Sequence, residues 1–592
     1  MSDHHARVLP FGAGILGDGQ TRFRFWAPAQ ETVSVAVEGG PIVPMARSPE
    51  GWFEAITHCP AGTRYRYRLA DGTLVPDPAS RAQATDVHDP SVVIDPSAYA
   101  WRNTSWRGRP WKEAVLYELH PGVLGGFRGV ATKLAKLAAL GITAVELMPI
   151  NDFPGRHNWG YDGVLPYAPD TSYGTPDDLK ALIDAAHDLG LMIFLDVVYN
   201  HFGPDGNYLS LYAPQIFRED HQTPWGAAID FRKPEVRQFF TENVLYWLME
   251  YRFDGLRFDA VHAIDDQTWV DEMAAAVHST IEPGRHVHLV LEHHNDASHL
   301  EKGCDAQWND DGHNVLHVLL TGEDAGYYGD YAAEPAQKLA RCLAEGFIFQ
   351  GDQSHYLGGP RGMPSAHLPP TAFVLFLQNH DQIGNRAFGE RLTTLVEPAA
   401  LEAAIALMML SPQIPLIFMG EETASRTPFL FFTDHGAELA DAVRQGRRNE
   451  FARFPAFADP AKREQIPDPN APRTFEASVP HGDAVHGPSR EALYRGLIAL
   501  RQAEIITRLD GAHTLDAKAV GPKAVVARWR MGDGSVLTLA SNLGDASATI
   551  KPLRGRRLFA TSDDAAMAAQ SGTLSGFCTC AWLDDADRPA NE

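Results

Sequence analysis

The amino-acid sequence predicts an α/β protein: a (β/α)8 TIM barrel with an N-terminal β-sandwich domain and a C-terminal β-domain. In residues 111–510, short apolar runs typical of buried strands alternate with amphipathic helical segments. The regions on either side show period-two alternation broken by turn residues, which indicates β-structure. An open doubly wound sheet would usually carry a glycine-rich phosphate loop after its first strand, and none follows here.

The first domain is predicted to span residues 1–95, followed by a linker over residues 96–110 that is rich in Pro, Ser and Trp. Turn clusters such as Glu38-Gly-Gly-Pro41 separate its strands. Those strands are expected where apolar and polar residues alternate, in Phe23–Trp26, Val33–Val37 and Tyr65–Leu69.

The catalytic barrel with long loops is predicted over residues 111–510, and the C-terminal β-domain over residues 515–592. One barrel helix is well marked: Thr175 suits the N-cap, Pro176 the first helical position, and Gly190 the end. The expected barrel strands are Ala114–His120, Thr143–Ile150, Leu191–Asn200, Gly255–Val261, His286–His293, Asp305–Asn309, Ala372–His380 and Ile414–Glu421.

Composition narrows the possible partners. Lys and Arg total 51 against 75 Asp and Glu, so the net charge of −24 argues against nucleic acid and anionic membranes. Five scattered cysteines do not suggest a disulfide framework. We see neither a signal-peptide pattern nor an apolar run long enough to span a membrane, so the expected location is the cytoplasm.

Carboxylates at predicted strand ends are the strongest functional signal. Asp259 and Glu292 each follow an apolar run, and Asp381 follows a third. Barrel enzymes keep their chemistry at the C-terminal ends of the strands. Two carboxylates on adjacent strand ends are what glycoside hydrolysis requires, one as nucleophile or base and one as acid.

Four blocks, in this order, carry a resemblance: Asp196-Val-Val-Tyr-Asn200-His201, Gly255–His262, Glu292 and Gln378–Asp381. They resemble the four signature regions of the α-amylase family of retaining glycoside hydrolases and transglycosylases. The resemblance implies that Asp259 is the nucleophile, Glu292 the general acid, and Asp381 a stabiliser of the oxocarbenium-like transition state.

The same resemblance implies roles for neighbouring side chains. His201 and His380 would hydrogen-bond the sugar in subsite −1, and Tyr161 would stack on it. Asp196 and Asn200 would support Arg257 and the local backbone, with Arg257 counted among the substrate-binding residues. Arg257 lies two residues before Asp259 on the same strand face, so we expect it to depress the pKa of Asp259. Glu292 needs a raised pKa to serve as the acid.

Further segments resemble the maltooligosyltrehalose trehalohydrolases within that family: Phe376–Leu392, Asp259–Ile264, Gln307–Asp311, Leu320–Glu323 and Phe431–His435. This resemblance implies cleavage of the α-1,4 bond next to the terminal trehalose of maltooligosyl trehalose, with trehalose and a maltooligosaccharide as products. It also implies a carbohydrate-binding-like N-terminal domain and a maltooligosyl trehalose synthase as metabolic neighbour. Alternatives are an α-1,4-glucan branching enzyme, an amylase, or a non-catalytic glycan-binding protein, which the intact carboxylates disfavour.

Two segments depart from the trehalohydrolase pattern: His293-His294 after the acid, and Gly312 with Asn314. We expect both near the barrel mouth, where they would alter subsite shape. Phe347 and Phe349 are the candidate aromatic contacts to the trehalose.

Metal-dependent hydrolysis is also disfavoured. A metal-hydrolase barrel would place His-x-His at the end of its first strand, and Glu118-Leu-His120 supplies a single His there. We expect no metal or organic cofactor in the reaction.

Overall fold

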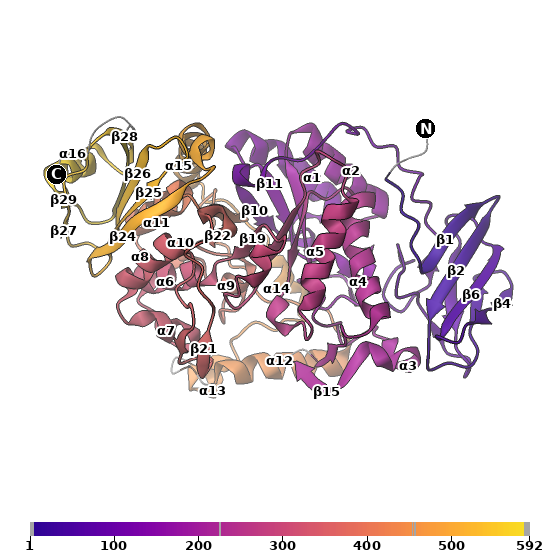
Figure 1. The fold of residues 1–592 in the computed structure, drawn as a ribbon. Coiled ribbons are helices and arrows are strands. Elements are labelled where there is room, and N and C mark those ends of the chain that lie inside the picture. Colours follow the sequence, from indigo (N-terminus) through magenta and orange to yellow (C-terminus); the bar gives the residue numbers. More distant parts are fainter. Residues whose placement is uncertain (1–4, 224–225, 453, 455–456, 585–592) are drawn as a thin grey trace.

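The protein is described from a computed structural model over residues 5–223, 226–452, 454 and 457–584 (Figure 1). Its centre is a closed barrel of eight parallel strands in the order β10-β11-β14-β17-β18-β19-β22-β23. This confirms the predicted fold class. The barrel strands are β10 (Leu116–Leu119), β11 (Ala144–Leu147), β14 (Met192–Val197), β17 (Gly255–Phe258), β18 (His288–Leu291), β19 (Ala306–Trp308), β22 (Phe373–Phe376) and β23 (Ile414–Phe418).

Every one of these strands lies within a predicted apolar run and is buried along its whole length. Burial on both faces explains the nearly continuous apolar pattern, since helices cover the outside and side chains fill the inside. The polar residue after each run is therefore delivered to the C-terminal rim of the barrel.

Helices surround the barrel. Thr175 caps α2 (Pro176–Asp188) through a capping box with Asp178, as predicted. Helix α6 (Asp310–Thr321) was not predicted; Asn309 caps it, and its side chain accepts a hydrogen bond from the backbone N–H of Gly312. The other principal barrel helices are α1 (Gly126–Leu140), α4 (Pro234–Leu245), α5 (Thr268–Thr280), α8 (Pro335–Glu345), α11 (Pro398–Leu410) and α15 (Gly487–Leu500).

Two sheets pack at the N-terminal end of the molecule, and a five-stranded sheet lies at the opposite end (Figure 1). The first N-terminal sheet contains β1 (Gly12–Gly17), β2 (Gln20–Trp26), β6 (Trp52–His58) and β5 (Ala46–Arg47). The second contains β4 (Ile42–Pro44), β3 (Ser34–Val37), β7 (Arg64–Arg68), β8 (Leu74–Val75) and β9 (Ser91–Val92). The C-terminal sheet contains β24 (His513–Gly521), β25 (Ala524–Arg530), β26 (Val536–Asn542), β30 (Cys578–Asp584) and β28 (Arg556–Ala560).

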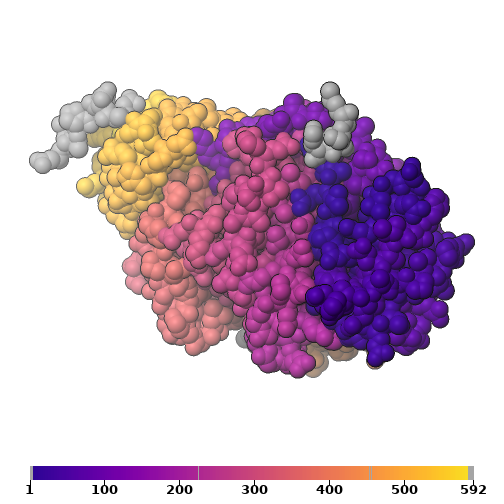
Figure 2. All heavy atoms as spheres, turned by 45° about the vertical axis from the view of Figure 1, so that its right-hand side comes forward, coloured from indigo at the N-terminus to yellow at the C-terminus, as the bar shows by residue number. Residues whose placement is uncertain are grey.

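The N-terminal sheets adjoin the barrel directly (Figure 2). Arg81, which follows the second sheet's β8 in the chain, forms a buried ion pair at 2.9 Å with Glu250, the last residue of the π-helix η4 (Tyr246–Glu250) that continues α4. The two side chains are only 7% and 2% exposed. All five cysteines are free and buried. In the described part of the chain, no helix is long and apolar enough to cross a membrane.

Candidate active site

The three predicted catalytic carboxylates lie at the C-terminal rim of the barrel. Asp259 directly follows β17, and Glu292 directly follows β18, the neighbouring strand. Asp381 lies in the short helix α9 (His380–Gly384), beyond β22. Asp259 and Asp381 are 122 residues apart in the sequence (381 − 259), and the strand order brings them to the same rim.

The guanidinium of Arg257 links three of the predicted residues. Arg257 Nη1 donates to Asp196 Oδ2 at 2.7 Å and to Asp259 Oδ1 at 2.9 Å. Its Nη2 donates to Glu292 Oε2 at 2.6 Å. The side chain of Arg257 is fully buried and lies over the ring of Trp308, 4.2 Å from its centroid. Because Arg257 is covered by these groups, it is suited to positioning the carboxylates.

The charge state of the pair differs from our expectation. Burial and the neighbouring Glu292 raise the pKa of Asp259 well above its ordinary value, despite Arg257. Burial opposes ionisation of Glu292 as well, but Arg257, His262 and the N–H of Ala260 outweigh it and lower the pKa of Glu292 to about 2. These directions are opposite to the expected order, in which the nucleophile has a depressed pKa and the acid a raised pKa. The reason is geometric: Glu292 receives both the guanidinium and the Ala260 N–H, at 2.9 Å.

The wall of the predicted subsite −1 is tightly hydrogen-bonded. The Tyr161 hydroxyl donates to Asp196 Oδ2 at 2.6 Å and lies 2.8 Å from His380 Nε2. The rings of Tyr161 and His380 are stacked, with centroids 5.1 Å apart. His201 hydrogen-bonds Asn200 and the backbone carbonyl of Tyr161. The structure thus brings these predicted residues together around the carboxylates.

Two acidic residues of this site were missed by the sequence reasoning. Glu118, at the end of β10, accepts from His380 Nδ1 at 2.5 Å and from the His380 backbone N–H at 3.1 Å. Burial opposes the charge on His380, but Glu118 and Asp381 raise its pKa to about 9. The signal for Glu118 was available, because it is a strand-end acid at the rim.

The second missed residue is Asp310, the first residue of α6 after β19. Burial and the nearby Glu292 raise its pKa to about 7, with Asp381 acting in the same direction and Arg361 opposing. Asp310 is thus a fourth carboxylate, close enough to Glu292 and Asp381 for their charges to interact. Its position after the sixth strand was the available signal.

The two candidate aromatic contacts to trehalose are buried in the protein. Phe347 is fully buried against Phe373, and Phe349 is 5% exposed and packs on Tyr331. Neither ring is accessible to a sugar in this structure, so this expectation is wrong. The exposed ring of this region is Tyr356, 50% exposed on the following hairpin.

One of the two departures also lies deeper than expected. Gly312 and Asn314 are buried within α6. A Cβ atom on Gly312 would stand 2.4 Å from Leu375 Cδ1, so this position has no room for a side chain without a shift of that residue. His293 and His294 do lie close to the mouth, directly after Glu292.

Comparisons with known proteins identify the family of this chain. Residues 85–215 match the family model described as "Alpha amylase, catalytic domain", and residues 512–580 match a domain of unknown function, DUF3459. The chain is 40% identical to a malto-oligosyltrehalose trehalohydrolase from Deinococcus radiodurans, over 84% of this chain and 83% of the relative. It is 41% identical to one from Saccharolobus solfataricus, over 75% of this chain and 80% of the relative.

A crystal structure of an alpha-amylase-like protein from Salmonella typhimurium superposes with a TM-score of 0.92 at 43% identity, covering 98% of this chain and all of that one. The identity to these relatives extends over most of both chains, and the four signature blocks lie at the barrel rim. Together they assign the sequence to a family. The chain belongs to the malto-oligosyltrehalose trehalohydrolase family within the α-amylase-type barrels.

Proposed function

We propose that this protein is a retaining glycoside hydrolase that cleaves the α-1,4 bond next to the terminal trehalose of maltooligosyl trehalose. The observation that carries the proposal is the sharing of one buried guanidinium by Asp259 and Glu292. Two carboxylates held on one cation are close enough for the short separation that retention requires, about 5 to 5.5 Å. Sequence identity to the named trehalohydrolases supplies the substrate class.

In the first step, Glu292 donates a proton to the glycosidic oxygen as Asp259 attacks the anomeric carbon. The bond to trehalose breaks, trehalose leaves, and a β-glycosyl ester forms on Asp259. In the second step, water attacks the same carbon while Glu292 takes the water proton, and Asp259 is released as a carboxylate. The net configuration is retained.

The coupling between the two carboxyl groups fits these two reaction steps. Asp259 and Glu292 titrate as a coupled pair: burial and Glu292 raise the pKa of Asp259, while Arg257 lowers the pKa of Glu292. A glycosidic oxygen placed against Glu292 accepts a hydrogen bond, which favours the form with the proton on Glu292. Asp259 is then the anion, as a nucleophile must be.

Other side chains complete the site. His380 is a cation beside Asp381, and its Nε2–H, which meets the Tyr161 hydroxyl, is the group that would reach a sugar hydroxyl. Asp381 would accept from sugar hydroxyls as positive charge develops on the ring. Tyr161 presents its ring beside His380. Asp196 and Asn200 support Arg257 and Asp259 through hydrogen bonds.

The domain boundaries proposed from the sequence, the cytoplasmic location and a maltooligosyl trehalose synthase as metabolic neighbour belong to the same proposal. The N-terminal domain would be carbohydrate-binding-like. The reaction needs no cofactor, because the carboxylates supply both the nucleophile and the proton.

The test compares two substrates of similar length, maltopentaosyl trehalose and maltoheptaose, with products separated by chromatography. We expect rapid release of free trehalose from the first and little cleavage of the second, both lost in Glu292→Gln. Equal cleavage of both substrates would indicate an amylase. Glucan chain transfer without trehalose would indicate a branching enzyme.

A further inference from the structure

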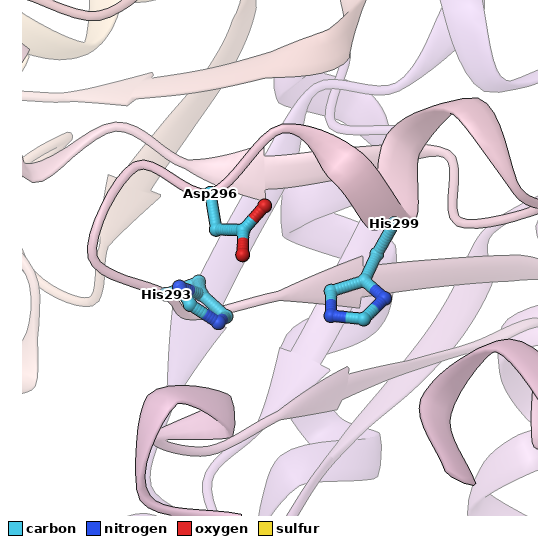
Figure 3. A group of neighbouring side chains, drawn as sticks. All are labelled: His293, Asp296 and His299. Carbon is cyan, nitrogen blue, oxygen red and sulfur yellow. The ribbon is translucent and has the colours of Figure 1, made fainter. Parts of the chain in front are cut away.

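A second cluster of ligand-type side chains begins one residue beyond Glu292 (Figure 3). A nitrogen of His293, a carboxylate oxygen of Asp296 and a nitrogen of His299, in η6 (Ser298–Glu301), all lie within 4.8 Å of one another. The two histidines are 6% and 4% exposed, whereas Asp296 is half-buried. The cluster is therefore preformed in the protein but reachable from solvent on its carboxylate side.

Gln267 adds a fourth group at a distance that suits a metal centre. Its side-chain carbonyl Oε1 lies 3.2 Å from His293 Nε2 and 3.3 Å from His299 Nε2. In a tetrahedral zinc site with metal–ligand bonds near 2.0 Å, neighbouring ligand atoms stand about 3.3 Å apart. The carbonyl oxygen thus lies from each of the two ring nitrogens at the spacing of neighbouring ligands around one ion.

The hydrogen bonds around His299 favour a cation at this point. His299 Nδ1 lies 2.7 Å from Asp271 Oδ1, so this nitrogen carries a proton and donates it to the carboxylate. In a neutral ring, Nε2 then presents a lone pair towards Gln267 Oε1, which is itself an acceptor. The Gln267 amide is held in this orientation by its donation to the Val261 carbonyl at 3.3 Å. A metal ion between the two lone pairs would satisfy both.

The Asp271–His299 pair also has the form of a known supporting arrangement. Histidines that bind metals commonly donate their other N–H to a carboxylate, which fixes the tautomer and increases the basicity of the ligating nitrogen. His293 is less constrained: within the described residues, its buried Nδ1 has no hydrogen-bond partner. The cluster is therefore not a closed hydrogen-bond network.

We propose that His293, Asp296, His299 and the side-chain carbonyl of Gln267 form a binding site for one divalent transition-metal ion of the zinc type. Two imidazoles with oxygen ligands suit Zn²⁺, Co²⁺ or Ni²⁺ better than Mg²⁺ or Ca²⁺, which prefer oxygen alone. The ion would join the loop after β18 to the start of α5. It would clamp the segment that carries Glu292 without touching the reacting atoms.

The chain offers a matched control in His294. This neighbour of His293 stacks on His262, with ring centroids 3.6 Å apart, and is not part of the ligand group. Substitution of His294 therefore removes a histidine from the same segment but leaves the proposed ligands in place.

The test uses the full-length protein after treatment with EDTA and dialysis. It is titrated with ZnCl2 by calorimetry and with CoCl2 by visible absorption. We expect one equivalent of metal per chain, Co²⁺ absorption typical of four-coordinate nitrogen and oxygen ligands, and a higher melting temperature with Zn²⁺. His293→Gln with His299→Gln should weaken this site by roughly 100-fold, whereas His294→Gln should retain it.

Asp296→Asn provides a milder variant if the double substitution does not fold, and we expect it to weaken binding by roughly 10-fold or more. Circular dichroism of each variant establishes that it is folded. The proposal is overturned if the wild-type protein binds no stoichiometric ion, or if the folded variants bind it as tightly as the wild type. Metal binding is measured without substrate, so this outcome is independent of the proposed hydrolase activity.

Discussion

Glu118 and His380 form a buried ion pair at the barrel rim, with Nδ1 and Oε1 2.5 Å apart and both side chains 1% exposed. The pair connects the first strand of the barrel to the helix that follows the seventh. It also holds a positive charge beside Asp381, within the wall of the sugar site.

This pair predicts a pH dependence of stability. The pKa of His380 is about 9 in the folded protein, above its ordinary value of 6.5. A raised pKa gives stability that is fully present below pH 6.5 and is lost as the pH rises to 9. His380→Gln should remove a contribution of roughly 1 to 3 kcal/mol at pH 6 and much less at pH 9. Denaturant unfolding of both proteins at the two pH values measures it; an equal difference at both would contradict the charged pair.

Glu118→Gln should reduce the positive charge of His380 while leaving the position of the imidazole unchanged. The amide retains an acceptor oxygen for the imidazole but lowers the pKa of His380, because the neighbouring negative charge is gone. We expect kcat to fall by roughly 10- to 100-fold near pH 8 and less near pH 6, where His380 stays protonated. Initial rates on maltopentaosyl trehalose at both pH values measure the effect. A pH-independent loss would indicate a structural role alone.

Substitution of the two catalytic carboxylates should divide the reaction into its steps. Glu292→Gln should lose roughly 10³-fold or more on maltopentaosyl trehalose but much less on α-maltosyl fluoride, whose leaving group needs no proton. Asp259→Asn should lose activity on both substrates, because the nucleophile is needed in either case. Fluoride release and trehalose release are measured in the first turnover, because Glu292 also takes the water proton in the second step with either substrate. Equal losses in Glu292→Gln on both substrates would remove Glu292 from the acid role.

Arg257→Lys tests whether one cation organises the pair. A lysine keeps the charge but cannot donate along the two directions that lead to Asp259 and Glu292. We expect a loss of roughly 10²-fold or more in kcat and about 3 kcal/mol or more in the free energy of unfolding. Steady-state rates and denaturant unfolding measure the two effects. The exposed pair of Arg128 with Asp178 supplies the control, since Arg128→Lys should change neither.

Asp310→Asn tests whether the charge of Asp310 acts on the Asp259–Glu292 pair. Removal of a nearby negative charge favours ionisation of the Asp259–Glu292 pair, so the basic limb of the pH–rate profile should move to lower pH, by roughly half a unit. Profiles of kcat/KM for the wild type and the variant provide the comparison. Asp324→Asn, at an exposed position, serves as the remote control. A basic limb that stays in place would mean that Asp310 does not act on the pair.

Much of this site could be predicted because barrel strands are buried runs that end at one rim. The polar residue that follows such a run can therefore be assigned to the rim from the sequence, as Asp259 and Glu292 were. Asp310 lies shortly after β19 and Glu118 lies within β10, one residue before its end. Both were missed because neither belongs to the four signature blocks. The order of pKa values could not be read from spacing, since it depends on which oxygen the Arg257 guanidinium and the Ala260 N–H reach.

The aromatic residues near the mouth show the limit of pattern reading. Phe347 and Phe349 lie in an irregular segment, where neither the helical nor the strand period says which side of the chain faces inward. Their burial follows from tertiary packing against Phe373 and Tyr331, which lie 26 positions after and 18 before them (373 − 347; 349 − 331).

The buried pair of Arg81 and Glu250 restricts how this protein can be shortened. A chain that began at residue 96 would lose Arg81, the cation that pairs with Glu250, and loss of one partner of a buried pair costs about 3 to 5 kcal/mol where the other charge stays buried. Expression of the barrel alone would therefore call for a compensating change such as Glu250→Gln. In this respect the N-terminal sheets are an integral part of the folded enzyme and not an accessory that can be removed.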